Sequence, residues 1–205
     1  MISTLILLFG LINLVMSITG RIKGLITLLS IQGFILFLII IFSHDISLDL
    51  NFLFLIFETL VIKTIVIPSL LKIILFENNI FRETEPYIPN FYSLVISSIM
   101  LFTGIILMPF YLGVSISTIL ISLFFITTKK KLLTNVIGFA MLENGIFLFS
   151  LSVAEEMPVI VNMGILLDVF IAIFILGLLV KKINTVFNDS NTCALCNLKD
   201  CGCDD

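Results

Sequence analysis

The chain has 205 residues and a formal net charge of −3, with 60% hydrophobic and only 12% charged residues. Its mean hydropathy is +1.25. A soluble domain carries about 25% charged residues because polar groups must cover its surface. The composition therefore excludes an ordinary soluble domain, gives no sign of nucleic-acid binding, and predicts that the chain folds in a lipid bilayer.

The apolar residues come in runs of about 20, the length of a helix that crosses a membrane. Strands of a barrel would alternate apolar and polar residues, so a helix bundle is predicted. We expect an all-α integral membrane protein with about seven transmembrane helices over residues 1–183 and a cytoplasmic tail over 184–205. The predicted spans are Ile2–Thr19, Gly24–Ser43, Phe52–Phe76, Phe91–Leu107, Phe110–Thr128, Leu132–Val153 and Val159–Val180.

Basic residues fall on one side of this predicted bundle. Ten of the eleven Lys and Arg residues lie in the loops after the first, third, fifth and seventh spans or, for Lys72, in the last turns before such a loop: Arg21, Lys23, Lys72, Arg82, Lys129, Lys130, Lys131, Lys181, Lys182 and Lys199. The other loops hold His44, acidic residues and the Met108–Pro109 turn, but no Lys or Arg. Because cytoplasmic loops are rich in Lys and Arg, the N-terminus is predicted outside and the C-terminus in the cytoplasm.

Two parts of the chain resemble each other at an offset of 110 residues. Phe52–Ile73 and Asn162–Ile183 each contain an apolar residue followed by a carboxylate, and a Lys-Ile pair fourteen residues further on. Both copies would run in the same direction, which predicts a parallel internal repeat. Chance similarity between two Ile- and Leu-rich segments is the alternative.

Four ionisable residues lie inside predicted spans and away from their cytoplasmic ends: Glu58, Lys63, Glu143 and Asp168. From the 1.5 Å rise per helical residue, all but Glu58 come out near the middle of a hydrocarbon layer about 30 Å thick. A charge there costs about 2.5–3.5 kcal/mol on insertion scales. Such residues usually face the bundle interior and mark ion or proton paths, so we predict that these four form a proton relay.

Structural ion pairing is the alternative for these residues. Glu58 and Lys63 are five positions apart, which places them on different faces of one helix, so a partner on another helix is favoured. Asn144 and Asn162 could orient carboxyl groups or water near the relay. Pro68 cannot donate a backbone hydrogen bond, which frees a carbonyl one turn earlier and predicts a kink. Gln32, Gly33 and Gly104 are interpreted as helix-packing residues.

The tail contains four cysteines, Cys193, Cys196, Cys201 and Cys203. Thiols stay reduced in the cytoplasm, so a disulfide framework is not expected. Four thiolates this close in the chain could bind zinc in tetrahedral geometry. A flexible tail without metal is the alternative.

The last two predicted spans carry a family resemblance. Ile137–Phe147 (IGFAMLENGIF) and Leu166–Ile171 (LLDVFI) resemble component E (HyfE) of hydrogenase-4-type energy-converting hydrogenases. That subunit is similar to the K subunit of respiratory complex I and the C subunit of Mrp-type antiporters, and the K-like part covers about residues 129–183. Length and span number fit HyfE along most of the chain, outside the last fifteen residues.

This resemblance implies a non-catalytic subunit in the multi-pass membrane arm of a prokaryotic inner-membrane complex. Its partners would be antiporter-like subunits and a hydrogenase or quinone module. Asp168 takes the place of one of two carboxylates in the K-type proton path. The other is displaced, because the K-type glutamate position holds Ala140 and Glu143 follows one helical turn later.

Two further functions stay open from the sequence: a subunit of a redox-independent Mrp-type cation/proton antiporter, and a scaffold between larger membrane subunits. A free-standing enzyme is not expected. The chain has one His and no nucleophile–base pair, phosphate-binding loop or haem motif. No cofactor is predicted in this subunit apart from the zinc on the tail.

Overall fold

The computed structural model describes residues 1–43, 56–77, 87–153 and 177, without the side chains of Glu58 and Leu132. In these ranges the chain is helical and forms no strand. Five helices are long and apolar enough to cross a membrane, and a shorter apolar helix precedes them. An all-helical fold with several membrane-length helices is therefore confirmed.

The predicted spans agree with the observed helices to within one or two residues at most ends. The third differs, because its helix is described only from residue 56 and changes type midway. The turn at Met108–Pro109 is present, with Met108 ending one helix and Pro109 capping the next. The helices are α1 (Ile2–Ile18), α2 (Ile22–Ser43), η1 (Glu58–Val66), α4 (Ile67–Glu77), α5 (Asn90–Leu107), α6 (Phe110–Thr128) and α7 (Leu132–Val153).

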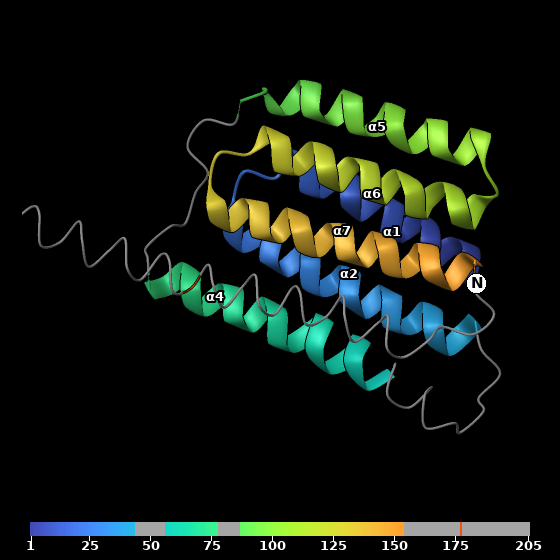
Figure 1. The fold of residues 1–205 in the computed structure, drawn as a ribbon, viewed down its shortest axis with the longest axis horizontal. Coiled ribbons are helices and arrows are strands. Elements are labelled where there is room, and N and C mark those ends of the chain that lie inside the picture. The colour runs from blue at the N-terminus through green and yellow to red at the C-terminus, as the bar shows by residue number, and fades with distance from the viewer. Residues whose placement is uncertain (44–55, 78–86, 154–176, 178–205) are drawn as a thin grey trace, which may run out of the picture.

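The helices lie side by side along the long axis of the molecule (Figure 1). Four of them, α1, α2, α6 and α7, form the centre, where α1 contacts α2 and α6 while α7 contacts α2 and α6. Helix α5 packs on α1 and α6, and the continuous η1–α4 helix packs on α2. The two peripheral elements thus lie on opposite sides of the bundle (Figure 1).

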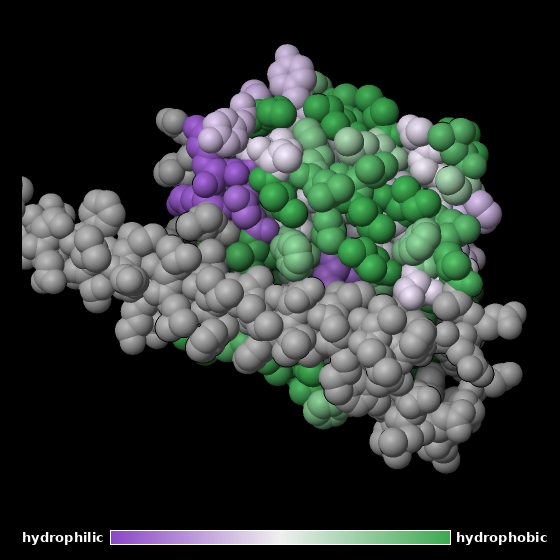
Figure 2. All heavy atoms as spheres, viewed as in Figure 1, coloured by the Kyte–Doolittle hydropathy of each residue, from purple (hydrophilic) through white to green (hydrophobic). Residues whose placement is uncertain are grey.

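Apolar side chains cover much of the outside of the bundle. Figure 2 shows them over the middle of the helices, with hydrophilic residues gathered at the end where α6 passes into α7. Several polar side chains are instead buried, including Asn13 and Gln32, which are fully enclosed. This distribution matches an environment of lipid, where exposed apolar surface is not penalised and polar groups must find partners inside.

The contact between α5 and α6 depends on two glycines. A Cβ on Gly113 would collide with the carbonyl oxygen of Gly104, and a Cβ on Gly104 would collide with the Ser117 hydroxyl. Ser117 Oγ donates to Gly113 O at 2.6 Å and reaches Met100 O on α5 at 3.1 Å. Small residues therefore let the two backbones approach closely, as the sequence predicted for Gly104.

Several sequence predictions lie outside the described residues. These are the seventh span apart from Gly177, the second copy of the predicted repeat, the relay residues Asp168 and Asn162, and the tail with Cys193, Cys196, Cys201 and Cys203. The number of spans, the repeat and the zinc site stay predictions.

Candidate functional site

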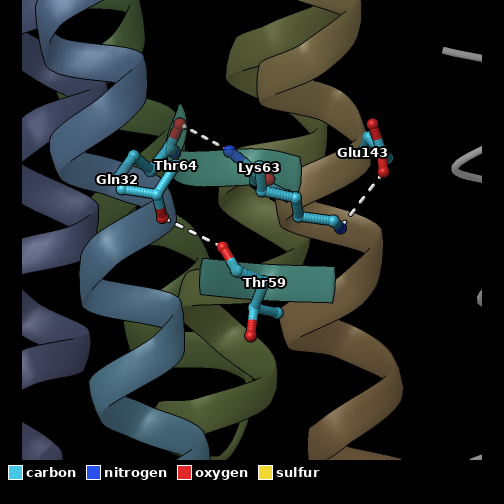
Figure 3. A network of polar contacts seen from close by, with 6 residues as sticks. Gln32, Thr59, Lys63, Thr64 and Glu143 are labelled. Carbon is cyan, nitrogen blue, oxygen red and sulfur yellow. Dashed lines mark hydrogen bonds and ion pairs between the residues drawn. The ribbon is translucent and has the colours of Figure 1, made fainter. Parts of the chain in front are cut away.

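A buried ion pair joins the peripheral helix η1 to the central helix α7. Lys63 Nζ lies 3.1 Å from Glu143 Oε1, and each side chain is only 2% exposed (Figure 3). The two atoms are close enough for a strong electrostatic contact, although neither makes a well-aligned hydrogen bond to a described residue. The pair is therefore held mainly by charge attraction in an environment of low dielectric constant.

A second residue of α7 also contacts the ammonium group. Lys63 Nζ lies 4.3 Å from the centroid of the Phe147 ring. Glu143 and Phe147 are four residues apart, so they lie on the same face of α7 one turn from each other. The carboxylate and the electron-rich ring face thus both stabilise a positive charge on Lys63.

The helix that carries Lys63 is wound more loosely than an α-helix. In η1 the Ile67 N–H donates to Ile62 O, five residues back instead of four. Such π-helical turns are rare and are often found at functional sites. The π-helical segment runs from Glu58 to Val66, directly before α4, and therefore includes Lys63.

Pro68 leaves a backbone carbonyl of η1 without its usual donor, and helix α2 supplies a replacement. Pro68 has no N–H, so it cannot donate to the carbonyl groups one turn earlier. The Thr64 carbonyl accepts a hydrogen bond from Ser30 Oγ of α2 at 2.7 Å. The freed acceptor predicted from Pro68 is thus matched by a serine of the next helix.

A chain of buried side-chain amides lies beside the ion pair. Asn144 Nδ2 donates to Gln32 Oε1 at 3.2 Å, and Gln32 Nε2 donates to Asn13 Oδ1 at 2.8 Å. Asn13 Nδ2 then donates to Thr118 Oγ1 at 2.9 Å. These four residues come from α7, α2, α1 and α6, so the chain links all four central helices.

The ion pair can move a proton without changing its net charge. If the proton passes from the ammonium of Lys63 to the carboxylate of Glu143, both groups become neutral and the total charge stays zero. Because the interior penalises an isolated charge heavily, a charge-conserving shift is much cheaper than ionising one group alone. The arrangement therefore suits a proton donor–acceptor couple, and it equally suits a static ion pair.

The structure brings together two of the four predicted relay residues. Lys63 has its partner on another helix, as expected, and that partner is Glu143. Glu58 opens η1, but its side chain is outside the described residues, as is Asp168. Asn144 lies beside the pair, and its amide donates to Gln32.

Sequence reasoning missed three members of the polar network. The sequence predicts only a packing function for Gln32 and makes no prediction for Asn13 and Thr118, although each is fully buried and hydrogen-bonded to a neighbouring helix. An amide inside an apolar span was the available signal, since it needs a partner when no water is near.

Similarity to other proteins is limited. No family model matches the chain. The uncharacterized protein Rv0085 of Mycobacterium tuberculosis is 33% identical over 84 residues, which make up 41% of this chain and 38% of that protein. The matched stretch thus spans less than half of either protein. No solved structure matches.

Proposed function

We propose that this chain is a non-catalytic membrane-arm subunit of an energy-converting hydrogenase or complex I-like assembly. In this function its buried charges take part in proton or sodium translocation coupled to electron transfer. The observation that carries the proposal is the enclosed Lys63–Glu143 pair, which joins two membrane-length helices. Intramembrane ionisable groups of this kind are typical of ion and proton paths.

The resemblance of Ile137–Phe147 to HyfE supports the same assignment, because Glu143 and Asn144 belong to that motif. We further propose that Asp168 and Glu58 extend the path, and that Asn162 supports it. The antiporter-like and hydrogenase or quinone-module partners follow from the same resemblance. Redox chemistry would belong to those partners.

The proposed orientation has the N-terminus outside a prokaryotic inner membrane and seven spans in total. It is supported by the basic residues, since Arg21 and Lys23 follow α1 and Lys129–Lys131 follow α6 at the same end of the bundle (Figure 1). Basic residues favour the cytoplasmic side of a membrane. With this orientation the cysteine tail is cytoplasmic, where zinc binding would be tested by metal analysis of the purified chain.

The first test is purification of the tagged full chain from its native membrane in mild detergent. The expected result is copurification with antiporter-like subunits and a hydrogenase or quinone module. Recovery with an antiporter but no redox subunit would instead favour the Mrp-type function. Recovery of the chain alone would contradict both.

The second test measures redox-driven proton uptake in vesicles that contain the intact assembly. Glu143→Gln and Asp168→Asn are compared with the parent, and copurification checks assembly in each case. Loss of proton uptake with normal assembly is expected. Unchanged uptake in both variants would overturn the relay and leave a scaffold whose buried acids only form ion pairs.

A further inference from the structure

The strongest unassigned feature is the way α2 contacts both of the helices that carry the ion pair, each at a residue next to or within the backbone of the charged residue. Within one turn, α2 presents Ser30, Gln32 and Gly33. Ser30 and Gly33 meet η1, whereas Gln32 meets α7. Figure 3 shows Gln32 and Thr64 together on the α2 side of Lys63, with Glu143 on the opposite side.

The contact with η1 fixes the backbone around Lys63. Ser30 Oγ bonds to the carbonyl of Thr64, the residue that follows Lys63. A Cβ on Gly33 would lie 3.2 Å from the Lys63 carbonyl oxygen, so the two helices touch backbone to backbone at that level. The position of Lys63 relative to α2 is therefore closely restrained.

The contact with α7 fixes the rotation of Glu143. Successive residues of an α-helix point about 100° apart, since 3.6 residues make one turn. When Asn144 bonds to Gln32, Glu143 is turned toward η1, where Lys63 lies. Rotation of α7 about its own axis would move both side chains together and break both contacts.

The amide chain behind Gln32 makes this restraint stiffer. From Asn144 to Thr118 each amide donates in the same direction, and Thr118 Oγ1 donates in turn to Val114 O at 2.8 Å. Hydrogen bonds aligned in series polarise and strengthen one another. Gln32 is thus anchored through Asn13 to α1 and α6.

We infer that Gln32 is a positioning residue for the Lys63–Glu143 pair, and that α2 sets the distance between the two charges through Gln32 and Ser30. This inference rests on the proposed function for what the pair does. Its structural content, that α2 controls the geometry of the pair, can be tested without any measurement of proton transfer.

The test is a mutant cycle on the full chain, with reversible unfolding in mixed detergent micelles as the readout. Gln32→Met keeps the length of the side chain and removes its hydrogen bonds. It is made in the parent and in a pair-free background, Lys63→Met with Glu143→Leu. Ser115→Ala serves as the matched control, because Ser115 is buried but bonds only to Leu112 of its own helix.

If Gln32 stabilises the protein only through its own hydrogen bonds, Gln32→Met will lower the ratio of folded to unfolded protein by the same factor in both backgrounds. If Gln32 positions the pair, the drop in the parent should be at least about threefold larger than in the pair-free background, as residues of one network show coupling. The control should give equal drops. Equal drops for Gln32→Met would overturn the inference.

Ser30→Ala provides a milder variant in case Gln32→Met does not fold. It removes the hydrogen bond to Thr64 O with little change in volume, and it should show coupling of the same sign. Absence of coupling in Ser30→Ala would overturn the part of the inference that concerns η1.

Proton uptake separates this inference from the proposed function. Gln32→Met should slow redox-driven uptake in the assembled complex if the pair relays protons. If Glu143→Gln leaves uptake unchanged while the mutant cycle still shows coupling, the proposed function is wrong and the positioning by Gln32 stands. If uptake depends on Glu143 and the mutant cycle shows no coupling, the positioning by Gln32 is wrong and the proposed function stands.

Discussion

Two helix contacts in this bundle are stabilised in opposite ways. Between α5 and α6, the backbones meet directly at Gly104 and Gly113, with only a serine hydroxyl between them. Between η1 and α7, a long basic side chain and a carboxylate bridge the two helices. The first contact gains its stability from close packing, which works as well in lipid as anywhere.

The second contact carries a large penalty, because two charges must leave water before they can attract each other. Replacing a buried ion pair with well-packed apolar residues is often neutral or stabilising. On this ground, apolar side chains at these two positions would be expected to hold η1 against the bundle as well as the charges do. The presence of charges where apolar residues would suffice favours a function for them beyond stability, and the following variants test that difference.

The largest effect is expected from breaking the ion pair on one side. Lys63→Met leaves the Glu143 carboxyl enclosed without its partner, which should cost about 3–5 kcal/mol in the free energy of unfolding. Lys63→Met combined with Glu143→Leu should recover most of that loss. Unfolding in mixed micelles measures both, and equal losses in the two variants would contradict a penalty for the unpaired Glu143 carboxyl.

A smaller loss is expected when the close contact of α5 and α6 is disturbed. Gly113→Ala places a methyl group against the Gly104 carbonyl, so the backbones must separate, at a cost of about 1–3 kcal/mol. Gly20→Ala is the matched control, since a Cβ there meets nothing within 4 Å. Similar stability of the two variants would contradict the importance of this contact.

Loss of the aromatic ring beside Lys63 should come next in size. Phe147→Leu removes the cation–π contact, which is worth about 0.5–2 kcal/mol depending on how far the site is desolvated. In the pair-free background the same change should cost less, because no cation remains. An equal cost in both backgrounds would mean that Phe147 contributes through packing only.

The smallest effect is expected at Thr103 on the outer face of α5. Its hydroxyl is exposed and donates to Ile99 O of the same helix. Thr103→Ala should change the free energy of unfolding by no more than about 0.5 kcal/mol. A larger loss would indicate that this face of α5 is covered in the folded protein.

The sequence was sufficient to locate the helices of the described residues because the signal for them is long and uniform. Runs of about 20 apolar residues, broken at positions such as Met108–Pro109, leave little freedom in where a membrane-length helix begins and ends. The change from η1 to α4 was only partly predictable. Pro68 indicated a disturbance of the helix, but the five-residue hydrogen-bond step lies where η1 contacts Ser30 and Gly33 of α2, and no local pattern encodes that contact.

Part of the geometry of the Lys63–Glu143 ion pair was also predictable from the sequence. Depth along the helix placed Lys63 and Glu143 at a similar level, and the spacing of Glu58 and Lys63 argued for a partner on another helix. Which helix supplies that partner depends on how α7 packs against η1 and α2. The amide chain was missed for the same reason, since Asn13 and Gln32 meet only when α1 and α2 are packed together.

The most direct measurement replaces the ion pair by apolar side chains and follows coupled proton uptake by the intact assembly. Lys63→Met with Glu143→Leu removes both charges together, so stability and copurification should stay close to those of the parent. We predict that this assembled variant loses proton uptake, because the ion pair is assigned to translocation and not to stability. Uptake at the parental rate would contradict it and make Lys63 and Glu143 a structural ion pair.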